Sequence, residues 1–152
     1  MAVNIIFGFI IPWICGILFF KDDKNILKKV VPFVSFLSVL INVAGNKYWL
    51  VMPRVKKWQF ITTFPQNFGY FPILGCIFIY TLYKKYTFTD IWVILFAILS
   101  TAVEYVMVVI RKVEYRKGWT IIHTFFIYAM SLWLLKNYYN WMENDSTVSN
   151  GS

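Results

Sequence analysis

The sequence predicts an all-α fold, a polytopic membrane helix bundle of about five transmembrane helices with one interfacial segment. Of its 152 residues, 59% are hydrophobic and 14% are charged, whereas soluble domains are about 45–50% apolar and about 25% charged. A water-soluble globule of this length could not bury so much apolar surface, because a large share of its residues must face water. The apolar residues also fall in runs close to membrane length, so lipid is expected to be the solvent for much of the chain.

The first apolar run, Val3 to Phe20, contains eighteen residues without a charge, close to the roughly 20 that span a bilayer. It has the length of a signal peptide, but it lacks a basic leading segment, and charged residues follow it where a small-residue cleavage site would stand. We therefore expect a retained helix. Pro12 is tolerated there because neighbouring groups can satisfy the carbonyl that it frees.

The second apolar run begins at Val30 and is interrupted by polar residues at 42–47. In one interpretation the helix ends near Ala44, with Gly45 and Asn46 as its C-terminal cap. In the other it continues to Met52, and the polar break is buried in the bundle, where broken helices usually line a cavity. The sequence leaves both open, and we expect the break to lie near one membrane face.

The stretch from Pro53 to Gln66 is too basic to span, and its Trp58 and Phe60 alternate with basic and polar residues. This mixture is typical of a segment at the headgroup level of a membrane. The third apolar run extends from Asn67 to Tyr83 and carries Pro72 near its start. We therefore expect an interfacial segment followed by a short third helix.

The fourth apolar run, Asp90 to Arg111, carries Glu104, and no other apolar run contains an acid. At 1.5 Å per residue, this carboxylate lies roughly 10 Å inside the end of the helix. An ionised carboxylate at such a depth costs roughly 2.5–3.5 kcal/mol on insertion scales, so it should face the bundle interior and have a partner. Ser100 and Thr101 lie four and three residues earlier on the same helix face. Together the three side chains predict a narrow polar stripe.

Two roles are open for Glu104. It can pin one helix to another through a hydrogen bond or ion pair, with His123, Arg54, Asn42 or a tyrosine as partner. Alternatively it can handle protons or cations, or form the polar end of a ligand pocket, as intramembrane acids commonly do. The candidate residues for a ligand or proton site are Glu104, Ser100, Thr101, Arg54, His123, Asn42 and Asn46.

The last apolar run opens at Trp119, spans to about Leu135 and contains His123, the single histidine of the chain. A lone histidine among apolar residues is more often a hydrogen-bonded packing residue than a ligand. A haem or a metal ion would usually need a second strong ligand, so no cofactor and no metal site is expected. From Glu143 onward the chain is polar, which predicts a disordered tail at 143–152 after a single transmembrane domain at 1–142.

The net charge is +8, and the fifteen Lys and Arg residues fall in short clusters between the apolar runs. Such flanks place positive charge at an anionic lipid surface. They favour membrane lipids as partners, and we expect no nucleic-acid partner, which a basic soluble protein would suggest. The basic residues divide almost evenly between the two predicted sides, so the sequence leaves the sidedness open.

Several positions in the second half of the chain form a recognisable pattern. It consists of MPRV at 52–55, a Phe-Pro pair at Phe71 and Pro72 that opens a helix, the acid Glu104, and Tyr115 followed by Trp119 at the last helix. In this spacing the chain resembles a family of small, uncharacterised four- to five-helix membrane proteins of spore-forming, low-GC Gram-positive bacteria.

The resemblance covers roughly Ser35 to Trp141 and implies a membrane helix bundle in a bacterial plasma membrane. The family has no established activity, so the resemblance implies an architecture and a source rather than a reaction. It implies that the positions to test first are Pro53, Arg54, Pro72, Glu104 and Trp119.

The sequence contains no GxxxxGK[ST] phosphate loop, no HExxH and no GxSxG. The predicted function is therefore a noncatalytic membrane module, either a subunit of a larger complex or a binder of a lipid-like ligand. A second membrane protein or further copies of the chain are the additional partners considered. The alternative is a carrier or an ion or proton pathway that uses Glu104. A membrane enzyme that combines Glu104 with Arg54 or His123 ranks third.

Overall fold

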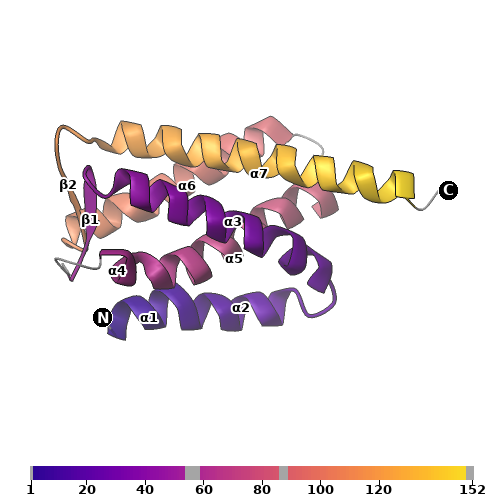
Figure 1. Cartoon of the computed structure of the whole chain (residues 1–152), viewed down its shortest axis with the longest axis horizontal. Coiled ribbons are helices and arrows are strands. Elements are labelled where there is room, and N and C mark those ends of the chain that lie inside the picture. Colours follow the sequence, from indigo (N-terminus) through magenta and orange to yellow (C-terminus); the bar gives the residue numbers. More distant parts are fainter. Residues whose placement is uncertain (1, 54–58, 86–88, 150–152) are drawn as a thin grey trace.

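A computed structural model describes residues 2–53, 59–85 and 89–149. In this part of the chain, five helical rods lie side by side (Figure 1), which confirms the predicted all-α class. The first rod comprises α1 (Ala2–Ile5), η1 (Ile6–Ile10) and α2 (Ile11–Phe19), and the second is α3 (Lys24–Gly45). The third rod comprises α4 (Gln59–Pro65), η2 (Gln66–Tyr70), α5 (Phe71–Tyr80) and η3 (Thr81–Lys85). The fourth is α6 (Thr89–Val109) and the fifth is α7 (Ile121–Ser149).

Three of the rods are long and apolar enough to cross a membrane, over Ala2–Phe19, Lys24–Gly45 and Asp90–Val109. Their outward faces are apolar, since Leu18 is 69% exposed and Val109 is 62% exposed. Water would not favour such faces, whereas lipid tails would cover them. The third and fifth rods contain more polar and tyrosine residues among their apolar ones, which lowers their mean hydropathy.

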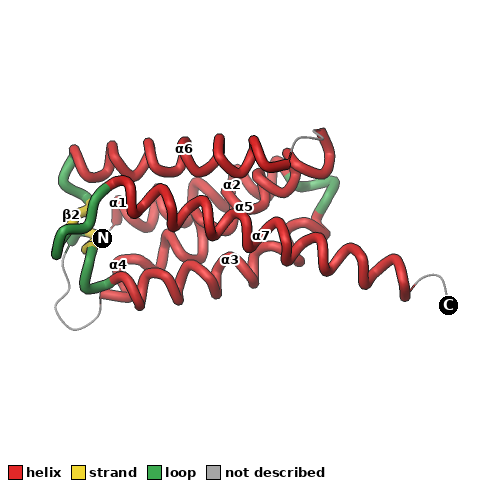
Figure 2. The backbone as a smooth tube through the Cα atoms, turned by 90° about the horizontal axis from the view of Figure 1, so that it is seen from above, coloured by secondary structure: helices red, strands yellow, loops and turns green. Residues whose placement is uncertain are grey.

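A two-stranded antiparallel ribbon, unforeseen in the sequence, closes one end of the bundle (Figures 1 and 2). It pairs β1 (Trp49–Val51), which follows α3, with β2 (Val113–Tyr115), which lies between α6 and α7. The register sets Trp49 opposite Tyr115, Leu50 opposite Glu114 and Val51 opposite Val113. Because β2 begins shortly after α6 and ends shortly before α7, the ribbon ties the end of α3 to both of these helices.

The apolar core lies between α3, α5, α6 and α7. Its fully buried side chains include Val30, Cys76, Phe78 and Ala97. Phe78 of α5 meets Phe96 of α6 edge to face, with ring centroids 5.3 Å apart. These contacts hold the four helices together, and the first rod packs against the outside of the third.

α3 ends at Gly45, as the first of the two interpretations of the polar break proposed, and Asn46 is its C-cap. The indole of Trp49 lies against this glycine. A Cβ atom on Gly45 would come within 1.8 Å of the Trp49 ring. The helix therefore ends where the chain turns back towards the ribbon, and the small side chain lets Trp49 fold over the helix end.

The predicted interfacial segment at 53–66 differs from the structure in its second half. Gln59 to Gln66 form the first turns of the third rod, so this helix begins eight residues before the predicted Asn67. Thr62 and Thr63 are buried there, which explains why these turns join the bundle instead of lying beside it. Residues 54–58, which include Arg54, lie outside the described residues.

The end of the chain also differs from the prediction, because α7 continues through Glu143 to Ser149, where a disordered tail was expected. The Lys29 ammonium of α3 contacts the Glu143 carboxylate at 2.5 Å. This ion pair joins the last turns of α7 to the beginning of α3. Residues 150–152 lie outside the described part of the chain.

The first and third rods approach each other most closely at Gly8 and Gly69, which lie in the π-helical turns η1 and η2. The turn η1 ends two residues before Pro12, and η2 ends two residues before Pro72. A proline has no backbone N–H, so it cannot donate to the carbonyl four residues earlier. For Pro72 this carbonyl belongs to Phe68, and the Trp13 indole of the first rod donates to it at 2.8 Å. A neighbouring rod therefore satisfies the freed group, as expected for proline in an apolar bundle.

Gly69→Ala tests this crossing. A Cβ atom at Gly69 would lie 2.2 Å from the Gly8 carbonyl oxygen, a backbone atom that cannot move aside. We expect a destabilisation of about 1–3 kcal/mol, the usual cost of overpacking, measured as a lower Tm in thermal unfolding of the detergent-solubilised protein. Gly16→Ala is the matched control, because its Cβ would meet only the flexible end of Ile73. Equal Tm losses in the two variants would contradict the proposed backbone contact.

Candidate ligand cavity around Glu104

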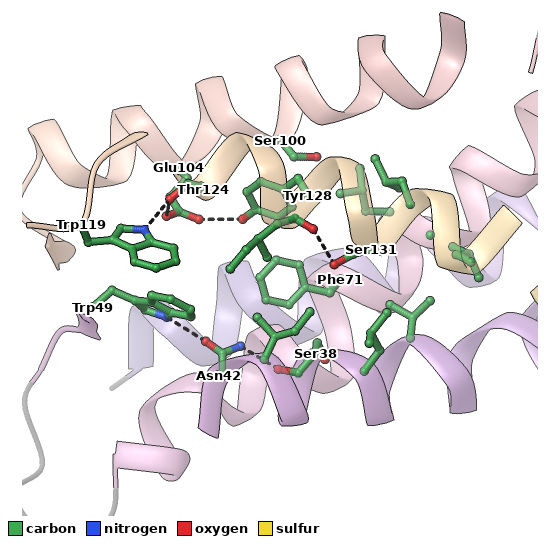
Figure 3. Close-up of a pocket in the computed structure, with 18 residues that line it drawn as sticks. Ser38, Asn42, Trp49, Phe71, Ser100, Glu104, Trp119, Thr124, Tyr128 and Ser131 are labelled. Carbon is green, nitrogen blue, oxygen red and sulfur yellow. Dashed lines mark hydrogen bonds between the residues drawn. The ribbon is translucent and has the colours of Figure 1, made fainter. Parts of the chain in front are cut away.

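A cavity of about 100 Å³ lies between α3, α5, α6 and α7, next to the ribbon (Figure 3). Most of its wall is apolar. The aliphatic part of the lining is Val34, Leu37, Ile41, Leu74, Ile127, Leu132 and Leu135. The polar side chains gather towards the ribbon, where the cavity is bounded by the indoles of Trp49 and Trp119.

Glu104 of α6 lines the cavity and accepts hydrogen bonds from three hydroxyl groups. Its Oε1 accepts from Tyr115 Oη at 2.7 Å and from Thr124 Oγ1 at 3.2 Å. Its Oε2 accepts from Tyr128 Oη at 2.7 Å. The donors come from β2 and α7, so the structure gives this acid the polar partners that its position requires.

A second layer of hydrogen bonds orients these donors. The Trp119 indole N–H donates to Thr124 Oγ1 at 3.0 Å, and the Thr124 hydroxyl in turn donates to Glu104, with Tyr115 Oη 3.0 Å away. Since an indole can only donate, Thr124 must accept at this contact. The carboxylate therefore sits at the end of a directed chain of donors.

Tyr115 stays a hydrogen-bond donor over a wide pH range. Burial raises the pKa of its hydroxyl above the ordinary value of 10, and the neighbouring Glu104 carboxylate adds to the rise, while the contact with Thr124 opposes it. The charged phenolate would lose its hydration and face a carboxylate, so the neutral phenol is favoured.

Asn42 organises the opposite wall. Its Nδ2 donates to Asn67 Oδ1 at 2.7 Å and to the Ser38 carbonyl at 3.1 Å, and its Oδ1 accepts from the Trp49 indole at 3.1 Å. Asn67 is fully buried in η2 and donates in turn to Thr63 Oγ1 at 3.4 Å. Sequence reasoning missed Asn67 as a site residue, although it is the first residue of the predicted third run.

The two polar walls meet at a pair of indoles. The ring centroids of Trp49 and Trp119 are 4.9 Å apart and the rings are tilted by 51°. Trp49 belongs to the Asn42 side and Trp119 to the Glu104 side. A row of hydrogen-bonding side chains thus crosses the bundle, and we call it the polar belt. Its members are Thr63, Asn67, Asn42, Trp49, Trp119 and Glu104. It crosses the bundle near the ribbon, because Glu104 lies five residues before the end of α6 and Asn42 three before the end of α3.

The remaining candidate residues on α6 differ in position. Ser100 is buried, lines the cavity and donates to the Phe96 carbonyl at 2.8 Å. Thr101 donates to the Ala97 carbonyl at 2.7 Å and is not part of the cavity lining. Of the predicted polar stripe, Glu104 and Ser100 therefore face the cavity.

His123 and Asn46 lie apart from the cavity. His123 is exposed and its Nδ1 accepts from the Thr120 backbone N–H at 3.3 Å, beside the Thr120 hydroxyl at 2.8 Å. This pairing caps the start of α7. Asn46 is exposed in the turn after α3, and Arg54 lies outside the described residues.

The chain matches no protein-family model, no curated protein and no solved structure. The resemblance to small membrane proteins of spore-forming bacteria therefore stays a prediction. Among the described residues, no group of three or more His, Cys, Asp and Glu side chains could hold a metal ion. The chemistry available at the cavity is that of one carboxylate, its hydroxyl donors and the surrounding rings.

Tyr115→Phe tests the ribbon donor. Loss of one hydrogen bond to the partly buried Glu104 carboxylate should destabilise the fold by about 1–3 kcal/mol at neutral pH. Because the folded-state pKa of Tyr115 is raised above 10, its contribution to stability is present below that pH and lost as the pH rises further. We therefore expect the Tm of the wild type to fall more steeply than that of the variant above about pH 10.

The matched control for this measurement is Tyr105→Phe, since Tyr105 is 56% exposed on α6. This variant should retain the wild-type pH dependence. Parallel Tm curves for the wild type and Tyr115→Phe would show that the buried phenol does not contribute to the alkaline loss of stability.

Proposed function

We propose that the protein is a noncatalytic membrane module that binds a small lipid-like ligand in the cavity beside Glu104. The observation that carries this proposal is the position of a carboxylate at the polar end of an otherwise mostly apolar cavity. Ligand sites have this composition, with apolar walls for the body of the ligand and a few placed polar groups that fix its orientation.

The carboxylate retains capacity for a ligand. Its two oxygens offer about four acceptor positions, and three hydroxyl groups of the protein donate to it. A ligand head can therefore add a hydrogen bond without displacing Tyr115, Thr124 or Tyr128. The partners of Glu104 hold it in place and supply no second acid or base, which favours binding over catalysis.

The size of the cavity limits what it can hold. A cavity of about 150 Å³ lined by apolar side chains accommodates benzene, so the present 100 Å³ suits a head group with its first carbons. The remainder of a longer ligand would leave between α3 and α7. There Leu37 and Ile41 of α3 and Ile127 and Ser131 of α7 line the cavity while being only half-buried.

The polar belt weighs against the alternative of a carrier or ion pathway. Its members lie near the ribbon end of their helices and follow one another across the bundle. A pathway would need polar groups along the helices, from one end of the bundle to the other. Along the cavity, the walls are mainly aliphatic, with four leucines, two isoleucines and Val34 in the lining.

The proposed location is a bacterial plasma membrane, with membrane lipids as the surrounding partners. Three rods of sufficient length and apolarity support insertion, and the resemblance described above supports the source. We expect the protein expressed in bacteria to remain in the membrane fraction after an alkaline carbonate wash and to need detergent for extraction. A protein that stays monodisperse in buffer without detergent would overturn the membrane assignment.

Ser131→Leu tests the cavity as a binding site. The added side chain would occupy the opening between α3 and α7, so saturable binding of 1-hexanol, followed by tryptophan fluorescence in detergent, should weaken by at least about tenfold. Thr101→Leu is the control, because Thr101 bonds the carbonyl four residues earlier, as Ser131 does, but does not line the cavity. Equal binding by both variants and the wild type would remove the cavity as the site.

A further inference from the structure

Aromatic rings surround the carboxylate end of the cavity. Figure 3 shows Glu104 between Trp119 and Tyr128, with Trp49 beneath Trp119 and Phe71 beneath Tyr128. The centroids of Trp49 and Trp119 are 4.9 Å apart, and those of Phe71 and Tyr128 are 6.3 Å apart. We call these four rings the aromatic box.

The hydrogen-bond donors around the box are already directed at protein acceptors. The hydroxyls of Tyr115, Thr124 and Tyr128 point to Glu104. The indole of Trp119 donates to Thr124 and that of Trp49 to Asn42. A ligand that needs a donor, such as a carboxylate or a phosphate, would have to break one of these bonds.

The serine hydroxyls in the cavity lining also donate to protein acceptors. Ser100 donates to the Phe96 carbonyl and Ser131 to the Ile127 carbonyl, at 2.8 and 2.7 Å. What these side chains leave for a ligand is acceptor capacity, namely the remaining positions on Glu104 and the hydroxyl lone pairs. The head of the ligand must therefore bring its own donor.

The charge of the lining selects among donors. Among the residues that the structure describes (2–53, 59–85 and 89–149), Glu104 is the one acid in the cavity lining, and no Lys, Arg or His side chain lines it. Aromatic faces attract cations through the quadrupole of the ring, most strongly when the site is desolvated. A cationic head with N–H groups would gain from the carboxylate and from the rings, whereas a neutral hydroxyl would gain only a hydrogen bond.

We infer that the aromatic box selects a ligand with a protonated amine head, an alkylammonium ion whose apolar chain lies along the Leu and Val wall. This inference rests on the proposed ligand-binding function and names the chemical class of its ligand. The ammonium donates to Glu104 and lies between the indole pair and the rings of Phe71 and Tyr128.

The test compares three six-carbon probes with the same chain: n-hexylammonium, 1-hexanol and hexanoate. The full-length protein is placed in nanodiscs of neutral phosphatidylcholine at pH 7, so that anionic lipid does not concentrate the cation. Binding is followed by tryptophan fluorescence. We expect n-hexylammonium to bind at least about tenfold more tightly than 1-hexanol, and hexanoate to show no saturable binding.

Variants separate the carboxylate from the rings. Glu104→Gln should reduce the affinity for n-hexylammonium to that for 1-hexanol. Glu114→Gln removes the same charge from an exposed ribbon residue paired with Arg116 and should bind as the wild type does. Phe71→Leu keeps the apolar bulk but removes one ring, so it should weaken n-hexylammonium severalfold and leave 1-hexanol unchanged.

The outcomes distinguish the inference from the function on which it rests. Equal affinities for n-hexylammonium and 1-hexanol in the wild type would overturn the amine class while the cavity stays a binding site. A preference for the amine that survives Glu104→Gln would overturn it too, because the attraction would then arise elsewhere. If no probe binds saturably, the inference and the proposed function both fail. The comparison of the three probes on the wild-type protein tests the inference even if Glu104→Gln does not fold.

Discussion

The hydrogen bonds that converge on the Glu104 carboxylate are the constraint on which the ribbon end of this bundle depends. A carboxylate inside an apolar helix needs several donors, and the three here follow α6 in the chain, with Tyr115 in β2 and Thr124 and Tyr128 in α7. The chain must therefore reverse within a few residues. It does so through Arg111 and Lys117, which adopt left-handed backbone angles with φ of 57° and 51°. Such residues are disfavoured by roughly 1–3 kcal/mol each, and the ribbon pairing with the bonds to Glu104 offsets that cost.

The bonds that hold the bundle together also shape the proposed binding site, so the two roles considered for Glu104 are compatible. Tyr115 and Tyr128 fasten α6 to the ribbon and to α7, and in doing so they use their donors on the carboxylate. Asn42 does the same on the other wall by holding Trp49 and Asn67. Once these donors are committed, the cavity between the walls offers acceptors and ring faces. The proposed preference for a cationic head is a consequence of how the bundle is held together.

The position of the polar belt near the ribbon fits a protein surrounded by lipid. Polar groups are least costly close to the membrane surface, and here they lie near the ribbon end of the bundle, as Glu104 and Asn42 do at the ends of α6 and α3. Farther from the ribbon, the four central helices meet through an apolar core. The first rod adds no side chain to the cavity lining; it packs on the third rod through a close crossing at Gly8 and Gly69.

The sequence by itself determined the helical class, the approximate limits of α6, and the need of Glu104 for a polar partner, because these follow from local hydrophobicity and the energy of a charge in an apolar helix. The tertiary structure decided that the partners are Tyr115, Thr124 and Tyr128 rather than His123. It also decided that Asn67 is a buried residue that accepts a hydrogen bond from Asn42, and that the third rod begins at Gln59. Three-residue strands leave no periodicity to read, and their register depends on where α3 and α6 end in space. Which hydroxyls reach the carboxylate is therefore a property of the assembled bundle.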